Sequence, residues 1–107
     1  MFAAERFEEA VRCFEGATQF DANNSDAWAY LARTYANTGA PSNALAASAR
    51  ALAHNPDVAL AWFAQGNALG SLKRHDEALA AYDRALALDP DDAKAWTNKG
   101  NALDTLW

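Results

Sequence analysis

The chain has 107 residues, enough for one domain and too few for two independent cores. It is 51% hydrophobic and 21% charged, which excludes a disordered chain, and its formal net charge of -5 is the wrong sign for a nucleic-acid-binding protein. Alanine makes up about a quarter of the residues and isoleucine is absent, so an all-α fold is favoured. No apolar run is long enough to cross a membrane.

Residues that start and stop helices divide the chain. They predict six helices, near residues 3–21, 25–38, 41–54, 59–72, 75–88 and 93–106. Residue types preferred at N-caps precede the second, fourth and sixth: Asn24 or Ser25, Asp57, and Asp91 or Asp92. Pro41 suits the first turn of the third helix, and Gly39 suits the end of the second. Pro56 and Pro90 cannot continue the third and fifth helices.

The sequence repeats with a period of 34 residues, which is the spacing between Trp28, Trp62 and Trp96. Further columns align at the same offset: Ala32, Gly66 and Gly100; Tyr35, Leu69 and Leu103; Ala10, Ala44 and Ala78; Ala17, Ala51 and Ala85; Pro56 and Pro90. Small residues seven apart on one helix face let two helices approach closely. The large side chains then fill the space between units, so that each unit needs its neighbours.

These columns resemble the tetratricopeptide repeat (TPR), a 34-residue helix-turn-helix unit. Residues 59–92 match its pattern nearly throughout, and residues 25–58 match as a second full repeat with Ser48 in place of an aromatic residue. In the same phase, residues 1–24 form the second helix of a truncated repeat, and residues 93–107 form the first helix of another. The resemblance implies an all-α, right-handed α-α superhelix of about six antiparallel helices, elongated and cut from a longer array.

The resemblance also implies that the first helices of successive repeats line a concave groove. Helical spacing places Trp28, Leu31 and Tyr35 toward the core. The opposite faces then carry Ala29, Tyr30, Arg33 and Asn37, then Phe63, Ala64, Asn67 and Ser71, and finally Lys94, Thr97, Asn98, Asn101 and Thr105. The peptide-binding candidates are Tyr30, Arg33, Asn37, Phe63, Asn67, Ser71, Lys94, Asn98 and Asn101. A ligand cage made by the tryptophans is an alternative to their role in the core.

The groove asparagines allow three interpretations. Carboxylate-clamp members of the family hold a C-terminal acid with lysines, an arginine and asparagines, and Asn67 and Asn98 fall in the asparagine columns of that clamp. Phe63 stands where its first lysine should be, so a complete clamp is not encoded. An asparagine ladder that holds the backbone of an extended peptide fits better, because each amide offers both a donor and an acceptor. The alternative is that these amides are solvated or bond a neighbouring loop.

No catalytic, cofactor or metal site is indicated. His54 and His75 lie 21 residues apart and no metal-ligand spacing surrounds them. The only cysteine, Cys13, cannot form an internal disulfide and is expected to be a buried or half-buried thiol. Together with the lack of a signal-peptide pattern, it favours a cytoplasmic location.

The sequence therefore predicts a protein-interaction module, not an enzyme, that binds a peptide or an extended partner segment in its groove. The alternative is a structural spacer or oligomerising arm of a larger, possibly enzymatic, protein.

The two half-repeats predict a second interaction. The last helix should leave Leu103, Leu106 and Trp107 partly uncovered, and the first should expose Phe7 and Phe14. Because these two helices are complementary, weak head-to-tail self-association is expected.

Overall fold

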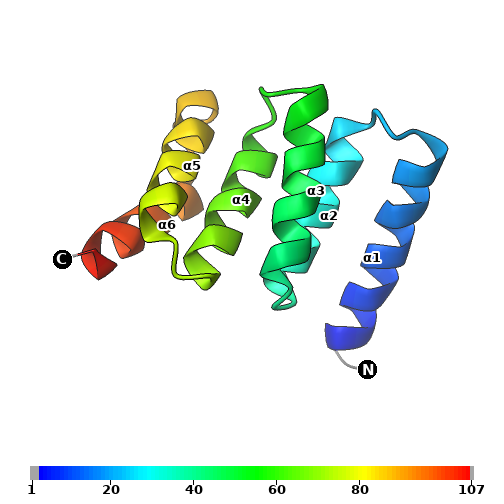
Figure 1. The fold of residues 1–107 in the computed structure, drawn as a ribbon, viewed down its shortest axis with the longest axis horizontal. Coiled ribbons are helices and arrows are strands. Elements are labelled where there is room, and N and C mark those ends of the chain that lie inside the picture. The colour runs from blue at the N-terminus through cyan, green and yellow to red at the C-terminus, as the bar shows by residue number, and fades with distance from the viewer. Residues whose placement is uncertain (1–2, 107) are drawn as a thin grey trace.

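The computed structural model describes residues 3–106, and the chain folds into six helices with no strand in this range. They are α1 (Ala3–Phe20), α2 (Ser25–Asn37), α3 (Pro41–His54), α4 (Ala59–Ser71), α5 (His75–Leu88) and α6 (Ala93–Thr105). Every boundary lies within one residue of its prediction, and the all-α fold is confirmed. Figure 1 shows the helices following one another from α1 (blue) to α6 (red), with the termini at opposite ends.

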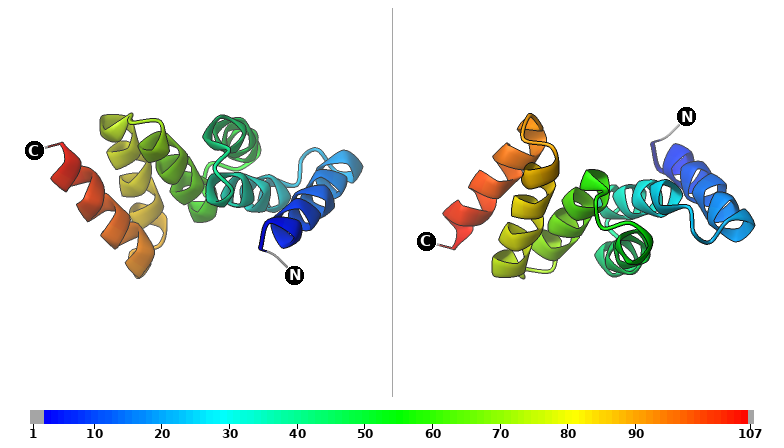
Figure 2. Two further views of the ribbon diagram at one scale, coloured as in Figure 1. Left: turned by 90° about the horizontal axis from the view of Figure 1, so that it is seen from below. Right: turned by 90° about the horizontal axis from the view of Figure 1, so that it is seen from above.

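The helices fall into two sets, and only one set makes contacts within itself. The inner set is α2, α4 and α6, and each of its members contacts the next. The outer set is α1, α3 and α5, whose members contact the inner helices but, over residues 3–106, not one another. Because the inner helices lie closer together than the outer ones, the stack curves toward the inner set (Figure 2).

The stack is less elongated than expected. Its principal extents are 42 × 32 × 23 Å, and the Cα radius of gyration is 13.4 Å. A compact domain of this length has a radius of about 13 Å. The reason is that a helix pair is about as wide as it is tall, so that a stack of this few pairs has no strongly preferred long axis.

The three tryptophans of the 34-residue period occupy equivalent positions. Each indole N–H donates a hydrogen bond of 2.8 Å to the carbonyl oxygen six residues earlier, on Ala22, Pro56 and Pro90 respectively. A cation lies over each ring, at 5.1 Å for Arg50 on Trp28 and 5.4 Å for Arg84 on Trp62. Arg50 and Arg84 are themselves 34 residues apart, whereas the cation over Trp96 is Lys99 of its own helix. Residues 34 apart, or a multiple of 34 apart, are called repeat-equivalent below.

Burial of the large column residues follows position in the stack. Leu69, Tyr82 and Leu86, near the middle, are buried, and Trp28 and Trp62 are half-buried. Trp96 and Leu103 on α6 and Leu106 directly after it are exposed, as expected for the two leucines. Trp107 lies outside the described residues. Phe7 and Phe14 are both half-buried, which corrects the expectation that they are exposed. Phe14 packs against the buried cluster that contains Leu31 of α2.

Two of the three predicted N-caps are confirmed. Asn24 accepts a hydrogen bond from the Ala27 amide, and Asp92 accepts from the first turn of α6. The prediction of Asp57 is wrong: α4 begins at Ala59 as predicted, but its N-cap residue is Val58, which has no capping side chain. Asp57 itself lies one position before the N-cap, in a turn in which its backbone amide donates to Asn55 Oδ1.

The turns that close the two full helix pairs use the left-handed backbone region. Gly39 has φ 78°, and its repeat-equivalent Lys73 has φ 65°. Glycine adopts this conformation without penalty, whereas a lysine has a Cβ that collides with the backbone.

Replacing Lys73 by glycine should therefore stabilise the protein. We expect the free energy of unfolding to rise by about 0.5–1 kcal/mol, because the strain of the left-handed lysine disappears. Chemical denaturation measures the change. Gly39→Ala is the matched control and should lose a similar amount; a loss of stability in Lys73→Gly would contradict the argument.

Candidate functional site

The inner helices form a groove made of two adjoining clefts. One, of about 410 Å³, lies between α2, α4 and the start of α6, and Phe63 forms part of its wall. The other, of about 400 Å³, continues toward α5. Both clefts share Asn37, Asn67 and Asn98, so they are parts of one surface.

Eight of the nine peptide-binding candidates line this groove: Arg33, Asn37, Phe63, Asn67, Ser71, Lys94, Asn98 and Asn101. The ninth, Tyr30, lies outside it. Its ring stacks on Phe14 of α1 with 5.5 Å between the centroids, and the Arg33 guanidinium lies 5.2 Å from its centroid. Tyr30 therefore belongs to the contact between α1 and α2, which helical spacing alone did not indicate.

Ala29 and Ala64 correct the expected groove face. Both are completely buried, whereas helical spacing placed them on the exposed side. The cause is the direct contact between successive inner helices, in which Ala29 packs with Ala61 of α4. Each inner helix therefore has a buried flank in addition to its core face, and the groove is narrower than a single-helix projection indicates.

A hydrogen-bonded amide pair lies at the centre of the groove. Asn67 Oδ1 accepts two hydrogen bonds, one of 2.5 Å from the Tyr82 hydroxyl and one of 2.8 Å from Asn98 Nδ2. These bonds fix the orientation of the side-chain amides of Asn67 and Asn98. Within the described residues, the Nδ2 donors of Asn67 and the Oδ1 acceptor of Asn98 have no protein partner, so one donor and one acceptor are available side by side.

Tyr82 supports this pair from below. Its side chain is buried against Phe63, with ring centroids 6.2 Å apart, and against Gly66, whose missing Cβ makes room for the ring. Burial raises the pKa of Tyr82 to about 12, while the adjoining Asn98 amide acts in the opposite direction. Its hydroxyl therefore remains a proton donor to Asn67 at any physiological pH.

The raised pKa of Tyr82 predicts a loss of stability in alkali. The neutral phenol contributes fully below its ordinary pKa of 10.0, and this contribution is lost as the pH rises toward about 12. At about 1.4 kcal/mol per pKa unit, the loss approaches 2–3 kcal/mol. Urea unfolding across this range measures it. Tyr82→Phe should remove the loss; an equally steep decline in that variant would assign it to other groups.

The groove is positively charged although the protein is acidic. Its cations are Arg33 and Lys94, and no aspartate or glutamate is among the residues that line either cleft. The formal charge of the chain is -5, so its acidic residues lie on other surfaces. An extended segment that carries acidic side chains would meet two cations and no carboxylate in this lining.

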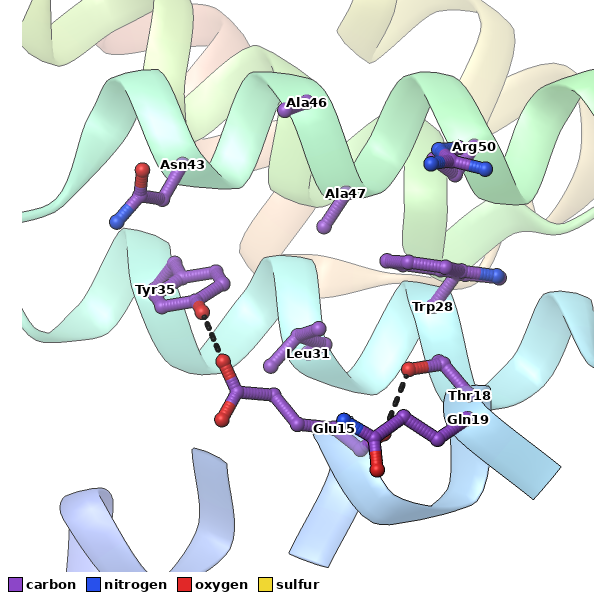
Figure 3. A pocket seen from close by; sticks show the side chains of 10 residues that line it. All are labelled: Glu15, Thr18, Gln19, Trp28, Leu31, Tyr35, Asn43, Ala46, Ala47 and Arg50. Atoms are coloured by element: carbon purple, nitrogen blue, oxygen red, sulfur yellow. Dashed lines mark hydrogen bonds between the residues drawn. The ribbon is translucent and has the colours of Figure 1, made fainter. Parts of the chain in front are cut away.

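A second type of cleft lies on the outer side of the stack. Figure 3 shows the one between α1, α2 and α3, where Arg50 lies across the Trp28 ring and Glu15 accepts a hydrogen bond of 2.9 Å from the Tyr35 hydroxyl. Burial, together with the hydrogen bond and negative charge of Glu15, raises the pKa of Tyr35. A repeat-equivalent cleft follows between α3, α4 and α5. The two outer clefts therefore arise from the regular stacking of the helices.

Sequence reasoning missed two groove residues and misplaced one thiol. His75 lines the second cleft, and Tyr82 lies beneath the amides. Tyr82 stands in the aromatic column of the repeat, but nothing in the sequence indicated that its hydroxyl reaches Asn67 on the inner helix. Cys13 is exposed, contrary to the expected burial, because α1 has an inner helix on one side only.

The described residues hold no cluster of three or more His, Cys, Asp or Glu side chains that could bind a metal ion. None of the helices within residues 3–106 is long and apolar enough to cross a bilayer.

Solved structures similar to this chain include several TPR domains. The first TPR of Spaghetti (RPAP3), bound to the HSP90 peptide SRMEEVD, aligns with a TM-score of 0.89 and 23% identity over 96% of this chain and 82% of that one. The second TPR domain of human RPAP3, in complex with the HSP70 peptide SGPTIEEVD, gives 0.83 and 21% over 92% and 82%. The crystal structure of MamA gives 0.83 and 26%, over 94% of this chain and 58% of MamA.

Sequence comparison gives the family directly. Among curated proteins, none matches this chain. Three models described as tetratricopeptide repeat match residues 1–68, 59–92 and 81–106. The first of these ranges covers more than half of the sequence, and the likeness of fold agrees with it. The chain belongs to the tetratricopeptide-repeat family.

Proposed function

We propose that this chain is a protein-interaction module that binds an extended segment of a partner protein along the groove of α2, α4 and α6. Family membership and the peptide-bound TPR domains of similar fold support protein interaction in general. The observation that carries the groove as the site is the amide pair Asn67–Asn98, which offers a fixed donor beside a fixed acceptor.

The backbone of a bound partner segment carries acceptors and donors that can pair with this donor and acceptor. The carbonyl oxygen of the partner backbone would accept from Asn67 Nδ2, and a backbone N–H would donate to Asn98 Oδ1. Because Tyr82 and the bond between the amides hold both side chains in place, little rotamer entropy is lost on binding. Asn101 extends the amide row, and Phe63 offers an apolar wall for one side chain.

The charges favour an acidic segment. Arg33 and Lys94 flank the cleft that contains Phe63 and have no acidic neighbour in its lining. The lysine of a complete carboxylate clamp is replaced by Phe63, so we infer that the segment is held by its backbone and by acidic side chains, with no requirement for a free C-terminus.

A peptide-display screen against the 107-residue chain, followed by calorimetry on the best binder, tests this function. Asn67→Ala, Asn98→Ala and Asn101→Ala should each weaken binding about tenfold, since a buried hydrogen bond is lost. Asn43→Ala, on the outer cleft, is the matched control and should bind like the wild type. Unchanged affinity in the three groove variants would remove the amide mechanism. Failure to select any peptide would favour a spacer or oligomerising arm.

A further inference from the structure

The donor and the acceptor that the amide pair offers stand on two different helices. Asn67 lies on α4 and Asn98 lies on α6, which are neighbours in the inner set. Oδ1 of Asn67 is already occupied by the Tyr82 hydroxyl and by Asn98 Nδ2. Within the part of the chain that the structure describes, the available donor, Asn67 Nδ2, therefore stands on the α4 side, and the available acceptor, Asn98 Oδ1, stands on the α6 side.

A single residue of an extended chain matches this pair. In an extended strand the N–H and the C=O of one residue point to the same side, which is why two facing residues of an antiparallel ladder exchange both of their hydrogen bonds. The N–H and the C=O of one trans peptide group point in opposite directions, so one peptide group cannot reach both amides. The pair Asn67–Asn98 therefore takes the place of a facing residue in a ladder.

This pairing has a direction, because the N–H of a residue precedes its C=O along the chain. The N–H would bond Asn98 on α6, and the C=O would bond Asn67 on α4. The segment would then enter the groove over α6 and leave over α4 toward α2. It would run against the order in which the inner helices follow one another in the sequence (Figure 1).

The Tyr82 hydroxyl determines the orientation of the amide pair. Tyr82 belongs to α5 and is buried, whereas Asn67 and Asn98 are half-buried at the groove surface. Because the hydroxyl donates to Oδ1 of Asn67, Nδ2 of that amide is turned toward the groove. Without the hydroxyl, the two amides can turn round together and still bond one another, which exchanges the available donor and acceptor. The direction of the segment therefore depends on a group beneath the pair.

The charge of the groove agrees with this direction. The repeat-equivalents of Asn67 are Arg33 on α2 and Asn101 on α6, so this column has a cation at the α2 end and a neutral amide at the α6 end. No carboxylate within residues 3–106 forms an ion pair with Arg33. Lys94, the other cation of the groove, stands in a different column. An acidic side chain that follows the paired residue toward the C-terminus would meet Arg33, and in the reverse direction it would meet Asn101.

We propose that the groove accepts its partner segment in one direction only, from α6 to α2, with an acidic residue on the C-terminal side of the backbone-paired residue. The inference rests on the proposed function, because it concerns the same site. Tyr82 is the positioning residue, since it acts on the segment through the orientation of Asn67. Arg33 reads the acidic residue and thereby distinguishes a segment from one of the same composition in reverse order.

Arg33→Ala tests the charge step. It should weaken binding of the peptide selected by the display screen about tenfold. This loss should vanish when the acidic residues in the C-terminal half of the peptide are changed to their amides, and it should persist when those in the N-terminal half are changed. Coupling of Arg33 to the N-terminal half would overturn the direction.

Spin labels on the same peptide test the direction itself. A nitroxide at its N-terminus should broaden the backbone amide NMR signals of Thr97 and Asn101 on α6. A nitroxide at its C-terminus should broaden those of Arg33 and Asn37 on α2. The opposite pattern, or equal broadening of both helices from either end, would overturn the direction and leave the proposed function intact. A selected peptide that shifts no groove signal would contradict the proposed function and the direction together.

Tyr82→Phe tests the positioning role. The ring stays in place and only the hydroxyl is removed, so each label should now broaden both helices, while affinity falls by no more than about tenfold. Tyr35→Phe is the matched control, because its hydroxyl bonds Glu15 on the outer side of the stack, and it should keep the single direction. A single direction that survives in Tyr82→Phe would show that the hydroxyl does not set it.

Discussion

Trp62→Ala should lower the free energy of unfolding by about 3 kcal/mol. The indole packs against a buried cluster on α4 and α5, donates to the Pro56 carbonyl at 2.8 Å, and lies beneath the Arg84 guanidinium. Removing it leaves a gap beside Leu69 and an unpaired carbonyl oxygen. Because α4 contacts four of the other five helices, the damage affects both neighbouring repeats.

Trp96→Ala is the matched control for this prediction. It removes the same indole with the same hydrogen bond, to the Pro90 carbonyl, but from a position that is 52% exposed at one side of the stack. The expected loss is about 1 kcal/mol. Guanidinium unfolding of the two variants gives both numbers, and equal losses would show that position in the stack does not determine the energy.

The helices could be predicted because their signals are local. Pro41, Gly39, Asn24 and Asp92 act within one turn of the chain, and the 34-residue period repeats them, so errors at one boundary are corrected by the others. Asp57 failed because it stands one position before the N-cap column that Asn24 and Asp92 occupy, and this repeat has Val58 in that column.

The groove face was predicted less well because it depends on distances between helices. Ala29 and Ala64 became buried when the inner helices approached one another, and a helical projection of one helix contains no information about that approach. The bond between Asn67 and Asn98 has the same origin, since it joins residues 31 apart on neighbouring inner helices. Composition and spacing supplied the residue types, and the tilt of one helix pair against the next determined which of them meet.

Gly66→Ala should destabilise the protein by about 1–2 kcal/mol, although alanine is the better helix former. The helix preference contributes roughly 1 kcal/mol in favour of alanine. Against it, the new Cβ would stand 2.6 Å from Tyr82 Cε1, and the Tyr82 ring is only 4% exposed and tied to Asn67 through its hydroxyl. The ring has to move, and overpacking of this kind costs about 1–3 kcal/mol or more.

The chain contains its own control for this effect, because Gly100→Ala places the same methyl group where nothing meets it. At concentrations where the chain is monomeric, that variant should gain stability by up to about 1 kcal/mol. Thermal and urea unfolding of both variants therefore test one claim: the sign of a Gly→Ala change is determined by the facing side chain. Two variants that shift in the same direction would contradict it.

In the preceding repeat, Ala32 and Ser48 occupy the positions of Gly66 and Tyr82, and this pair follows the same rule. Where the inner helix has a methyl group at this column, the outer helix has a small side chain, and both residues are completely buried. Where the inner helix has a glycine, the outer helix has the Tyr82 ring. In a double-mutant cycle, Gly66→Ala should therefore cost less in a Tyr82→Ser background than alone, with a coupling of about 1 kcal/mol or more. Additive effects would mean that the ring and the glycine are energetically independent despite their contact.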